Sequence, residues 1–417
     1  MLGTAQPAFT LQLINTITSV ANRPSPARRE CMERSPQARG IARSRTAIAC
    51  AAVVLAIAGA ETVRWSQARA AAAPSTVQAV VPGRVALSEL SRSLIPMPRN
   101  TPSAHASAMA TLPGDRMITF WWAGSRESGP DVKVYASQWQ NGKWGEPWMV
   151  ASRETLGQAL GFGVRRIGNP VAWTGPDGRI HLYVVATGLG GWAASRVAHM
   201  VSSDQGASFA MKRVLPMSPL FNTSVLVRTN AVGLVDGGWW LPVYFEIGIK
   251  YPMMMGFGPD GEPTGLGRIG ARTTTLQPAI VPVSNTEVRA WMRDASDERR
   301  VQHARSRDGG ASWEDLPALD LNNENTSMAV LRLANGEFLM LHNHIIEGGG
   351  SRSLLRLSLS KDGHTWRTVA DVASGGKSDE FSYPTMQQVG QELHVTYTFQ
   401  RQAIAHHRYR ISIGEST

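Results

Sequence analysis

The sequence predicts an all-β fold built from repeated four-stranded sheets. Short apolar and aromatic runs of strand length recur from about residue 117 onward, separated by turns rich in Gly, Pro, Asp and Asn. In chain order the runs are ITFWWAG, VKVYASQW, IHLYVVAT, GGWWLPVYF, VRAWM, FLMLHNH, LLRLSLS and LHVTYTF. No long apolar period of 3.6 residues accompanies them, so helices should be rare. A turn motif also recurs at a spacing of about 50 residues, which is typical of a propeller blade, and the chain holds about six such units.

The recurring turn follows the pattern Ser-x-Asp-x-Gly-x-Ser-aromatic. It is complete at residues 202–209 and 306–313, and a shorter form occupies residues 360–366. The Asp and Ser side chains can bond the backbone of their own turn, and Gly takes the conformation with positive φ. We expect the aromatic ring to fill the space between adjacent strands, and the Asp residues to stabilise hairpins rather than to act in catalysis.

The spacing of these Asp boxes indicates where the motif has been lost. Asp204 and Asp308 are 104 residues apart, nearly twice the 54 residues between Asp308 and Asp362. One repeat between the first two boxes therefore lacks the motif, and we assign it to residues 260–261. Residues 141–144 (NGKW) are interpreted as a reduced version.

The charge of the chain gives little reason to expect a nucleic-acid partner. The formal net charge is +10, but nine Arg and three Glu in residues 1–70 account for +6 of it. The remaining +4 is spread over the rest of the chain without a basic run, although it could draw an anionic sugar to a cleft. Both cysteines, Cys31 and Cys50, lie in the front segment. No metal-ligand spacing stands out, since the adjacent His406 and His407 would face opposite ways on a strand.

The front segment has the order of a secretory signal. Arg43 and Arg45 precede the apolar stretch 46–60, which ends in the small residues Ala-Gly-Ala at 58–60. The stretch is shorter than the roughly 20 apolar residues that span a bilayer. Cleavage there, or after the Ala-Arg-Ala at 68–70, is expected, and an uncleaved anchor is the alternative.

The chain is therefore divided into a leader with a flexible lead-in, residues 1–75, and a propeller, residues 76–417. An internal Met32 would start a leader of ordinary proportions. The expected location is outside the cytoplasm, periplasmic or secreted, with no membrane contact beyond an N-terminal anchor.

The boxes and several sequence blocks resemble the sialidase superfamily of Asp-box (BNR-repeat) proteins over roughly residues 85–412. The blocks are WAGSRESGPDV at 122–132, GNPV at 168–171, EFSYP at 380–384 and TYTFQR at 396–401. The resemblance implies a six-bladed β-propeller of sialidase type. It also implies an exo-acting glycoside hydrolase for an acidic sugar, sialic or uronic, of a glycan or polysaccharide, without a cofactor.

The resemblance implies roles for four residues. Arg126 and Asp131 match an Arg and Asp pair in which the Asp is the general acid and base and the Arg holds the substrate carboxylate. Arg352 matches another carboxylate-binding arginine, and planar guanidinium groups suit this task because they bind carboxylates in a bidentate manner. Tyr383 matches the nucleophile. A neutral phenol can approach an anomeric carbon that bears a carboxylate with less repulsion than Asp or Glu, but its ordinary pKa near 10 requires a partner base.

The sequence departs from the family pattern at several of the expected positions. Leu94 stands where the resemblance implies another arginine. The base Glu and the remaining arginine align with Asn325 and His344, and Glu324 lies one residue from the former. A shift of one residue reverses the facing on a strand, so Glu324 stays a catalytic candidate.

Other polar residues could complete the site. Glu246 would share a strand face with Tyr244, and Glu380 lies three residues before Tyr383, so either could supply a carboxylate. His105 and Arg401 are substrate-binding candidates by family position, as is His344. Hydrogen-bonded structural roles are the alternative for each.

Three functions fit this set of residues. The leading one is hydrolysis of an acidic glycoside with Asp131 as acid and Tyr383 as nucleophile. A polysaccharide lyase would use Tyr383 and a His to remove a proton next to a uronate. A carbohydrate-binding propeller without activity is favoured by Leu94 and Asn325 and opposed by the retained Asp131 and Tyr383.

Overall fold

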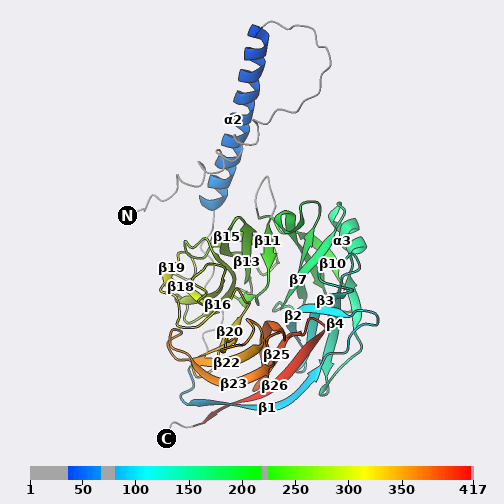
Figure 1. Cartoon of the computed structure of the whole chain (residues 1–417), viewed down its shortest axis with the longest axis vertical. Helices are drawn as coiled ribbons and strands as arrows, with labels where there is room; N and C mark the ends of the chain where they lie inside the picture. Colours follow the sequence, from blue (N-terminus) through cyan, green and yellow to red (C-terminus); the bar gives the residue numbers. More distant parts are fainter. Residues whose placement is uncertain (1–35, 67–79, 218–223, 415–417) are drawn as a thin grey trace. The chain divides into compact units, whose positions relative to one another are not determined.

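The computed structural model describes residues 36–66, 80–217 and 224–414, and six antiparallel sheets account for most of the last two ranges (Figure 1). The sheets form a six-bladed β-propeller, as the sequence predicted. The described helices are α2 (Pro36–Ser66), α3 (Arg153–Leu160) and the short 3-10 helix η1 (Gly191–Ala194).

The first three blades follow one another along the chain. Blade 1 contains β2 (Ser103–Leu112), β3 (Arg116–Gly124), β4 (Lys133–Gln140), β5 (Lys143–Trp144) and β6 (Trp148–Ala151). Blade 2 contains β7 (Arg166–Thr174), β8 (Ile180–Thr187), β9 (Ser195–Ser202) and β10 (Ala210–Val214). Blade 3 contains β11 (Val225–Val227), β12 (Val232–Gly233), β13 (Trp239–Ile247), β14 (Ile249–Phe257) and β15 (Pro263–Arg268).

The last three blades have four strands each. Blade 4 contains β16 (Thr275–Pro282), β17 (Val288–Asp294), β18 (Gln302–Ser306) and β19 (Glu314–Leu316). Blade 5 contains β20 (Ala329–Arg332), β21 (Phe338–Asn343), β22 (Leu354–Ser360) and β23 (Arg367–Ser374). Blade 6 contains β24 (Phe381–Val389), β25 (Glu392–Phe399), β26 (Ala403–Gly414) and the earlier strand β1 (Arg84–Leu94).

Pairing of the first strand with the last closes the ring. β1 runs antiparallel to β26 from the Arg84 and Gly414 pair to the Leu94 and Ala405 pair. The inner strand β2 of blade 1 packs against β24 of blade 6 on one side and β7 of blade 2 on the other. This pairing joins the two ends of the chain in one blade and so completes the ring.

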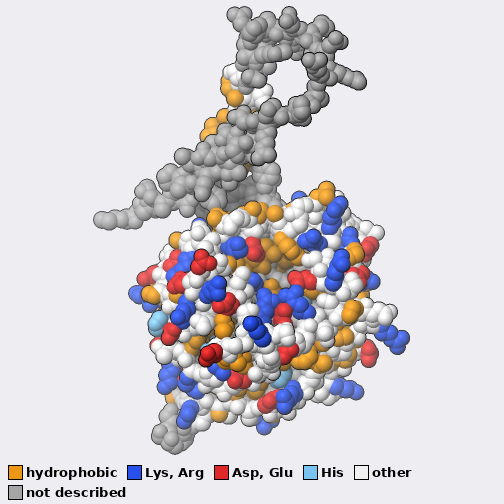
Figure 2. Space-filling model, in the orientation of Figure 1, with side chains coloured by type: hydrophobic (Ala, Val, Ile, Leu, Met, Phe, Trp, Pro, Cys, Tyr) orange, Lys and Arg blue, Asp and Glu red, His pale blue; other side chains and the backbone are white. Residues whose placement is uncertain are grey.

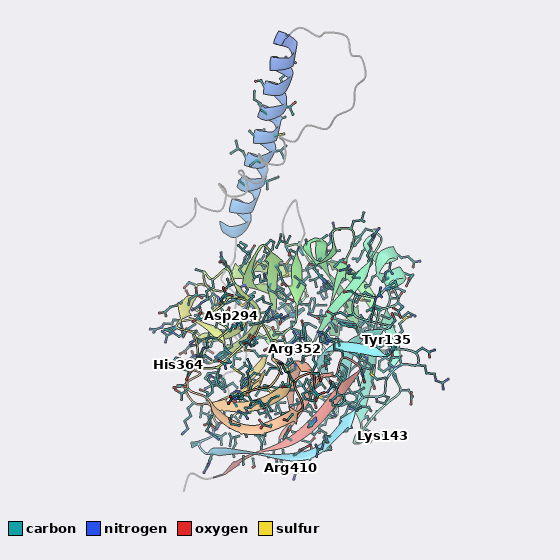
Figure 3. All side chains as sticks on the ribbon, viewed as in Figure 1. Tyr135, Lys143, Asp294, Arg352, His364 and Arg410 are labelled. Atoms are coloured by element: carbon teal, nitrogen blue, oxygen red, sulfur yellow. The ribbon has the colours of Figure 1, made fainter. Side chains whose placement is uncertain are left out.

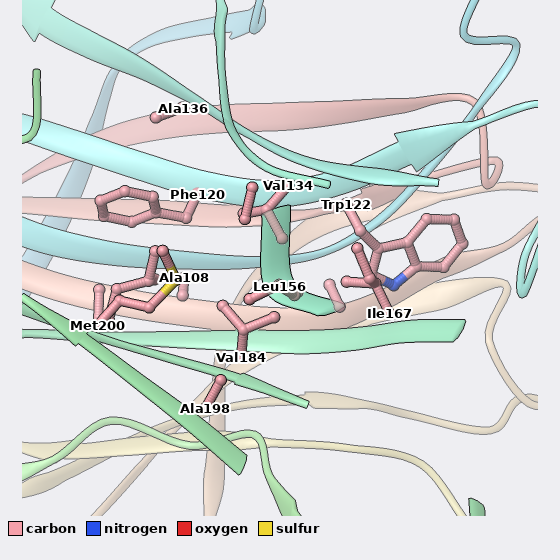
Figure 4. Packing of buried hydrophobic residues seen from close by; sticks show 14 of the residues in the cluster. Ala108, Phe120, Trp122, Val134, Ala136, Leu156, Ile167, Val184, Ala198 and Met200 are labelled. Carbon is pink, nitrogen blue, oxygen red and sulfur yellow. The ribbon is translucent and has the colours of Figure 1, made fainter. Parts of the chain in front are cut away.

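The apolar core lies between neighbouring blades. One cluster joins blades 1 and 2 and includes Phe120, Leu156, Val184 and Met200, all buried (Figure 4). Strands buried on both faces explain why the sequence shows continuous apolar runs rather than strict alternation. At about 25 cal/mol per Å² of apolar surface, such contacts between blades are the main stabilising term.

The Asp boxes connect the third and fourth strands of blades 2, 4 and 5. In blade 4, Asp308 accepts hydrogen bonds from the Ser306 hydroxyl (2.8 Å), the Ser312 amide (2.8 Å) and the Ser312 hydroxyl (2.5 Å). The Ser306 hydroxyl also accepts from the Gly310 amide at 2.8 Å. These are the bonds within the turn that the motif predicted.

The motif predicted only that each box aromatic fills the space between adjacent strands, and in the structure the ring reaches a strand of the preceding blade. Phe209 of blade 2 lies 5.6 Å, between ring centroids, from Phe120 of blade 1. Trp366 of blade 5 lies 5.9 Å from Trp291 of blade 4. The box therefore links blades as well as closing a turn.

The two degenerate repeats occupy the corresponding places. Trp144, after the turn of blade 1, donates from Nε1 to His406 Nδ1 of blade 6 at 3.0 Å. Asp260, between β14 and β15 of blade 3, accepts from the Glu262 amide at 2.9 Å. Both turns keep part of the geometry without the complete motif.

The antiparallel order places two sets of loops at opposite ends of the ring. The boxes lie at one end, with the β2–β3 turns and their equivalents. The loops β3–β4, β17–β18, β21–β22 and β25–β26 lie at the other end, where the inner strands begin. The candidate residues come from this second end.

The apolar stretch 46–60 lies within α2, and Cys50 is exposed there. None of the helices within the described residues has both the length and the apolar character that a bilayer crossing requires. Met32, Cys31 and the second cleavage position at 68–70 lie outside the described residues.

Candidate functional site

Bulges in three inner strands shape the candidate site. The register of β24 shifts between Ser382 and Thr385, and Tyr383 within the bulge has φ 53°. Equivalent bulges place Ala106 of β2 at φ 58° and Gln277 of β16 at φ 53°. A left-handed backbone costs a residue other than Gly about 1–2 kcal/mol, so the surroundings must hold it. Bulges of this kind often occur next to functional sites, where they re-aim a side chain.

Cationic and aromatic side chains from four blades surround Tyr383. The His105 ring lies 4.2 Å from the Tyr383 ring, between centroids. The guanidinium carbons of Arg228 and Arg352 lie 5.2 and 5.7 Å from the ring centroid. Arg293 Nη1 lies 3.4 Å from the phenol oxygen, in position to donate a hydrogen bond. Figure 3 shows Arg352 near the middle of the ring of blades.

Blade 4 supplies two polar residues that the sequence analysis did not identify. Arg293, near the end of β17, donates from Nη1 to Gln277 Oε1 at 3.2 Å and from Nε to Asn325 Oδ1 at 2.6 Å. Gln277 Nε2 in turn donates to Tyr244 Oη at 3.3 Å. The side chain hydrogen-bonded to Arg293 beside the phenol is thus an amide, which cannot take a proton as a carboxylate does.

Glu380 holds two arginines in place. It accepts from Arg352 Nη1 at 2.7 Å, Arg401 Nε at 2.6 Å and the Ser382 hydroxyl at 2.7 Å. Burial favours the protonated acid, but the bonds from Arg401, Ser382 and Arg352 dominate and lower its pKa to about 2. Glu380 is therefore held as a carboxylate that orients Arg352 and Arg401, and a role for it in catalysis stays a prediction.

The electrostatics favour a negative charge on Tyr383. Burial alone would raise its pKa, but the charges of Arg293, Arg352 and Arg228 together lower it below the ordinary value of 10.0. Burial holds the pKa of His105 well below 6.5, and the Arg401 charge lowers it further. His105 is therefore neutral at neutral pH, and its buried Nδ1 has no hydrogen-bond partner among the described residues.

Arg126 and Asp131 lie in the exposed loop between β3 and β4, at the same end of the ring. Asp131 accepts from the Ser125 amide at 2.8 Å and the Ser125 hydroxyl at 2.7 Å, and the hydroxyl bond contributes most to lowering its pKa. Among the described contacts, none joins Asp131 or Arg126 directly to Tyr383. Their loop is tied to the cluster through Glu127, which pairs with Arg401.

The three remaining candidates, Glu246, Glu324 and His344, make no described contact with Tyr383. The backbone amide of Glu246 donates to Ser224 Oγ at 3.2 Å, and the Glu246 charge contributes to raising the pKa of the neighbouring Tyr244, after burial and Tyr383. Glu324 pairs with Arg299 at 3.3 Å. His344 lies near the Arg356 and Asp371 pair on the outer strands of blade 5, and its pKa is lowered mainly by burial.

The structure also shows which residues occupy the places that the family resemblance assigned to Leu94 and His344. Leu94 lies on β1, the outermost strand of blade 6, and is 52% exposed, whereas the blade 1 residue that faces Tyr383 is His105. The arginine beside the phenol oxygen is Arg293 rather than a residue at position 344. Sequence motifs suggested His105 but not Arg293, because they follow Pro and strand patterns, whereas the facing of each side chain depends on the bulges.

One signal in the sequence could have indicated the bulges. Asn169, Gln277 and Tyr383 each precede a proline within an inner strand. Proline cannot donate to a strand ladder and is confined to edges and bulges, so a polar residue followed by proline inside a strand run indicates a bulge.

Below Tyr383, toward the box end, the central channel widens into a cavity of about 990 Å³. Inner-strand residues of blades 3 to 6 line it, with Arg228 and Pro384 among them. Across the face in view in Figure 2, basic and acidic side chains are interspersed. Within the described residues, no cluster of three His, Cys, Asp or Glu side chains could hold a metal ion.

Solved structures similar to this chain share the propeller. A protein of unknown function from Dyadobacter fermentans aligns with a TM-score of 0.63 and 15% identity, over 80% of this chain and 100% of that one. A Hadza microbial sialidase aligns at 0.61 and 14%, over 75% and 66%. A Trypanosoma rangeli sialidase in complex with sialic acid aligns at 0.56 and 14%, over 80% and 59%. This chain thus spans less than two thirds of either sialidase, and at these identities the likeness concerns the fold alone.

The family of the chain follows from comparison of its sequence with known proteins and family profiles. No curated protein matches it. The profile of the BNR repeat-like domain matches residues 115–395, more than half of the chain and five of the six blades in full or in large part. The chain therefore belongs to the family of BNR repeat-like domains and carries it on a six-bladed propeller of the sialidase type.

Proposed function

We propose that this chain is an exported glycoside hydrolase that acts on an acidic sugar, sialic or uronic, with Tyr383 as the nucleophile. The observation that carries the proposal is the phenol of Tyr383 in a cluster of arginines with Arg293 at 3.4 Å from its oxygen. Cations at this position stabilise the phenolate, which is the reactive form of the nucleophile.

Substrate binding in this proposal uses the same cations. Arg352 and Arg293 flank the phenol from blades 5 and 4, and a guanidinium group binds a carboxylate through paired hydrogen bonds. The sugar carboxylate would lie against these groups, with its anomeric carbon above the Tyr383 oxygen. Attack by the phenolate forms a tyrosyl glycoside and releases the leaving group, and water then hydrolyses that bond.

Asp131 is proposed as the acid that protonates the leaving oxygen. Its exposed loop lies at the correct end of the ring, and the Glu127 and Arg401 pair fixes that loop near the cluster. Since no described contact joins Asp131 to Tyr383, the loop has to move to bring the carboxyl over the bound sugar. Loops often complete a site in this way when substrate binds.

The first test measures release of fluorophore from sialosides and uronosides. We expect turnover by the wild-type protein and a loss of at least about 1,000-fold in kcat for Tyr383→Phe. Tyr409→Phe, in the buried core of blade 6, is the matched control and should retain activity. No turnover on a broad panel of acidic glycosides would contradict the proposal.

A second candidate is a polysaccharide lyase, favoured by the neutral His105 with its unpartnered Nδ1 and by the amide of Gln277 in place of a carboxylate. Tyr383 or His105 would take the C5 proton of a uronate, the C4 to oxygen bond would break, and a C4=C5 double bond would form. The arginines would stabilise the charge that develops on the carboxylate. The unsaturated product absorbs in the ultraviolet and a hydrolysis product does not, so one absorbance trace separates the two reactions.

A binding protein without activity is the third outcome of these measurements. It requires that an acidic sugar bind with equal affinity to the wild-type protein and to Tyr383→Phe, with no product from either. Export is tested by the first residue of the mature protein, which should follow Ala60 or Ala70 if the leader is cleaved.

A further inference from the structure

Arg228 crosses the central channel directly beneath Tyr383. It follows β11 in blade 3, and its side chain extends to blades 1 and 6. Nη1 donates to the Ser107 carbonyl and to Thr385 Oγ1, both at 3.2 Å, and Nη2 donates to the Pro384 carbonyl at 2.9 Å. Only 2% of the residue is exposed, so the guanidinium group is almost completely removed from water.

The charge of Arg228 has no carboxylate partner among the described residues. Its three acceptors are uncharged, and its Nε has no hydrogen-bond partner in the described structure. Arg352 and Arg401, in contrast, share the carboxylate of Glu380. A buried unpaired cation is costly, and its cost falls when a negative charge forms nearby.

The nearest group that can take a negative charge is the phenol above it. The Arg228 guanidinium carbon lies 5.2 Å from the centroid of the Tyr383 ring. Burial lowers the pKa of Arg228 to about 10, with the Tyr383 charge acting in the opposite direction. Arg228 therefore stays charged at neutral pH.

The hydrogen bonds of Arg228 end on the two bulges that form the site. Pro384 and Thr385 directly follow Tyr383, which has φ 53°, and Ser107 directly follows Ala106, which has φ 58°. Thr385 Oγ1 also donates to the Ser107 carbonyl at 2.8 Å, so the two bulges and the guanidinium group form one network. This network holds the backbone on both sides of Tyr383.

We infer that Arg228 is a positioning residue for Tyr383, a buried cation that fixes the bulge beneath the phenol and stabilises negative charge on its oxygen. The inference rests on the proposed function for its consequence in catalysis, but the effect on the phenol is independent of any substrate. In this chain the charge of a buried arginine favours the phenolate form of Tyr383, which a carboxylate base would otherwise help to form.

Other charged and titratable groups also face Tyr383, and the test must separate them from Arg228. They are Arg293 of β17, Arg352 before β22, His105 of β2, Tyr244 of β13 and Glu380 before β24. Arg228 lines the channel cavity beneath Tyr383, whereas Arg293 and Arg352 do not. These residues can therefore be altered independently.

The experiment is a pH titration of the phenols in protein labelled with ¹³C at tyrosine Cζ. The chain has seven tyrosines, and comparison with Tyr383→Phe assigns the resonance of Tyr383. We expect Arg228→Met to raise the pKa of Tyr383 by about one unit or more, because an opposite charge at this range shifts a pKa by about 1–3 units. Arg332→Met is the control, since Arg332 also lines the channel cavity and donates to the Val283 carbonyl, away from Tyr383.

An unchanged pKa of Tyr383 in a folded Arg228→Met protein would overturn the inference. If that variant does not fold, the paired variant Arg293→Met with Arg352→Met answers the same question. The Tyr383 phenol must then still titrate below that of buried Tyr244, and titration at or above Tyr244 would contradict a role for Arg228. A raised pKa without any turnover by the wild-type protein would retain this inference and reject the hydrolase.

Discussion

At the scale of single residues, the site depends on the difference between paired and unpaired arginines. Arg352 and Arg401 are fixed by Glu380, whereas Arg293 is held by the uncharged Gln277 and Asn325. An arginine without a carboxylate partner keeps its charge available for a ligand or for the phenolate. Arg352 and Arg401 are therefore fixed by a carboxylate, whereas the charge of Arg293 can interact with a bound anion.

Removing the carboxylate of Glu380 tests this division. Glu380→Gln should raise KM for an acidic sugar by about tenfold, because Arg352 loses its charged anchor, and should change kcat less. The pKa of Glu380 is about 2, so this group should add no limb to the pH profile of activity above pH 4. Steady-state kinetics on the substrate found in the first test gives both values.

Glu392→Gln provides the matched control for that variant. Glu392 of β25 accepts from Arg408 of β26, from Nε at 3.0 Å and from Nη2 at 2.6 Å. A similar rise in KM in this control would show that the effect of Glu380 is general destabilisation and not anchoring of Arg352.

The residues of the site could be predicted from the sequence only in part. Tyr383, Arg352, His105 and Arg401 lie together as the motifs suggested, and whether they act in catalysis stays a prediction. Arg228, Arg293 and Gln277 were missed. They come from blades 3 and 4, outside the Asp box of blade 4 and outside the sequence blocks, and the facing of their side chains depends on bulges.

At the scale of the elements, each Asp box acts on two blades at once. Its Asp and Ser residues close the turn, while its aromatic ring packs on the second strand of the preceding blade. The sequence predicted the first contact because it is local. It did not predict the second, because the identity of the neighbouring surface depends on how the blades are arranged in the ring.

Loss of one box should therefore lower stability without changing the site. We expect Asp308→Ala to lower the free energy of unfolding by about 1–2 kcal/mol, since three hydrogen bonds to its carboxylate are lost at a solvent-exposed turn. Asp260→Ala, which removes one bond at the corresponding turn of blade 3, should have a smaller effect. Denaturant unfolding measures both, and equal effects would contradict a specific role for the complete motif.

At the scale of the whole molecule, buried histidines link the stability of the ring to pH. His181 Nδ1 and His199 Nε2 lie 2.9 Å apart in blade 2, and His394 Nδ1 and His406 Nε2 lie 3.0 Å apart in blade 6. Burial lowers the pKa values of His181 and His394 to about 4. Burial lowers those of His303 and His342 to about 4 as well.

Acid should destabilise the propeller in a defined range. These histidines stay neutral in the folded protein, whereas the unfolded chain binds protons below about pH 6.5. Stability is therefore complete above pH 6.5 and falls as the pH drops to about 4, by about 3 kcal/mol or more in total. Thermal unfolding between pH 7 and 4 measures this loss. His394→Gln should reduce it, and an identical loss in that variant would contradict the assignment.

The architecture of the whole ring followed from the sequence more directly than its site did. The number of blades could be predicted because the repeat length is fixed by four short strands and their turns. Closure through β1 and β26 could not, because no local pattern connects strands more than 300 residues apart. The function of the leader and the place of the mature N-terminus stay predictions.

In the proposed reaction, the arginines around Tyr383 bind the carboxylate of the sugar. The most direct measurement is calorimetric titration with N-acetylneuraminate and glucuronate and with their methyl esters, which have the same shape without the charge. At least one acid should bind, at least about tenfold more tightly than its ester, and Arg352→Met should remove this preference. Equal binding of acid and ester, or binding of neither acid, would contradict it.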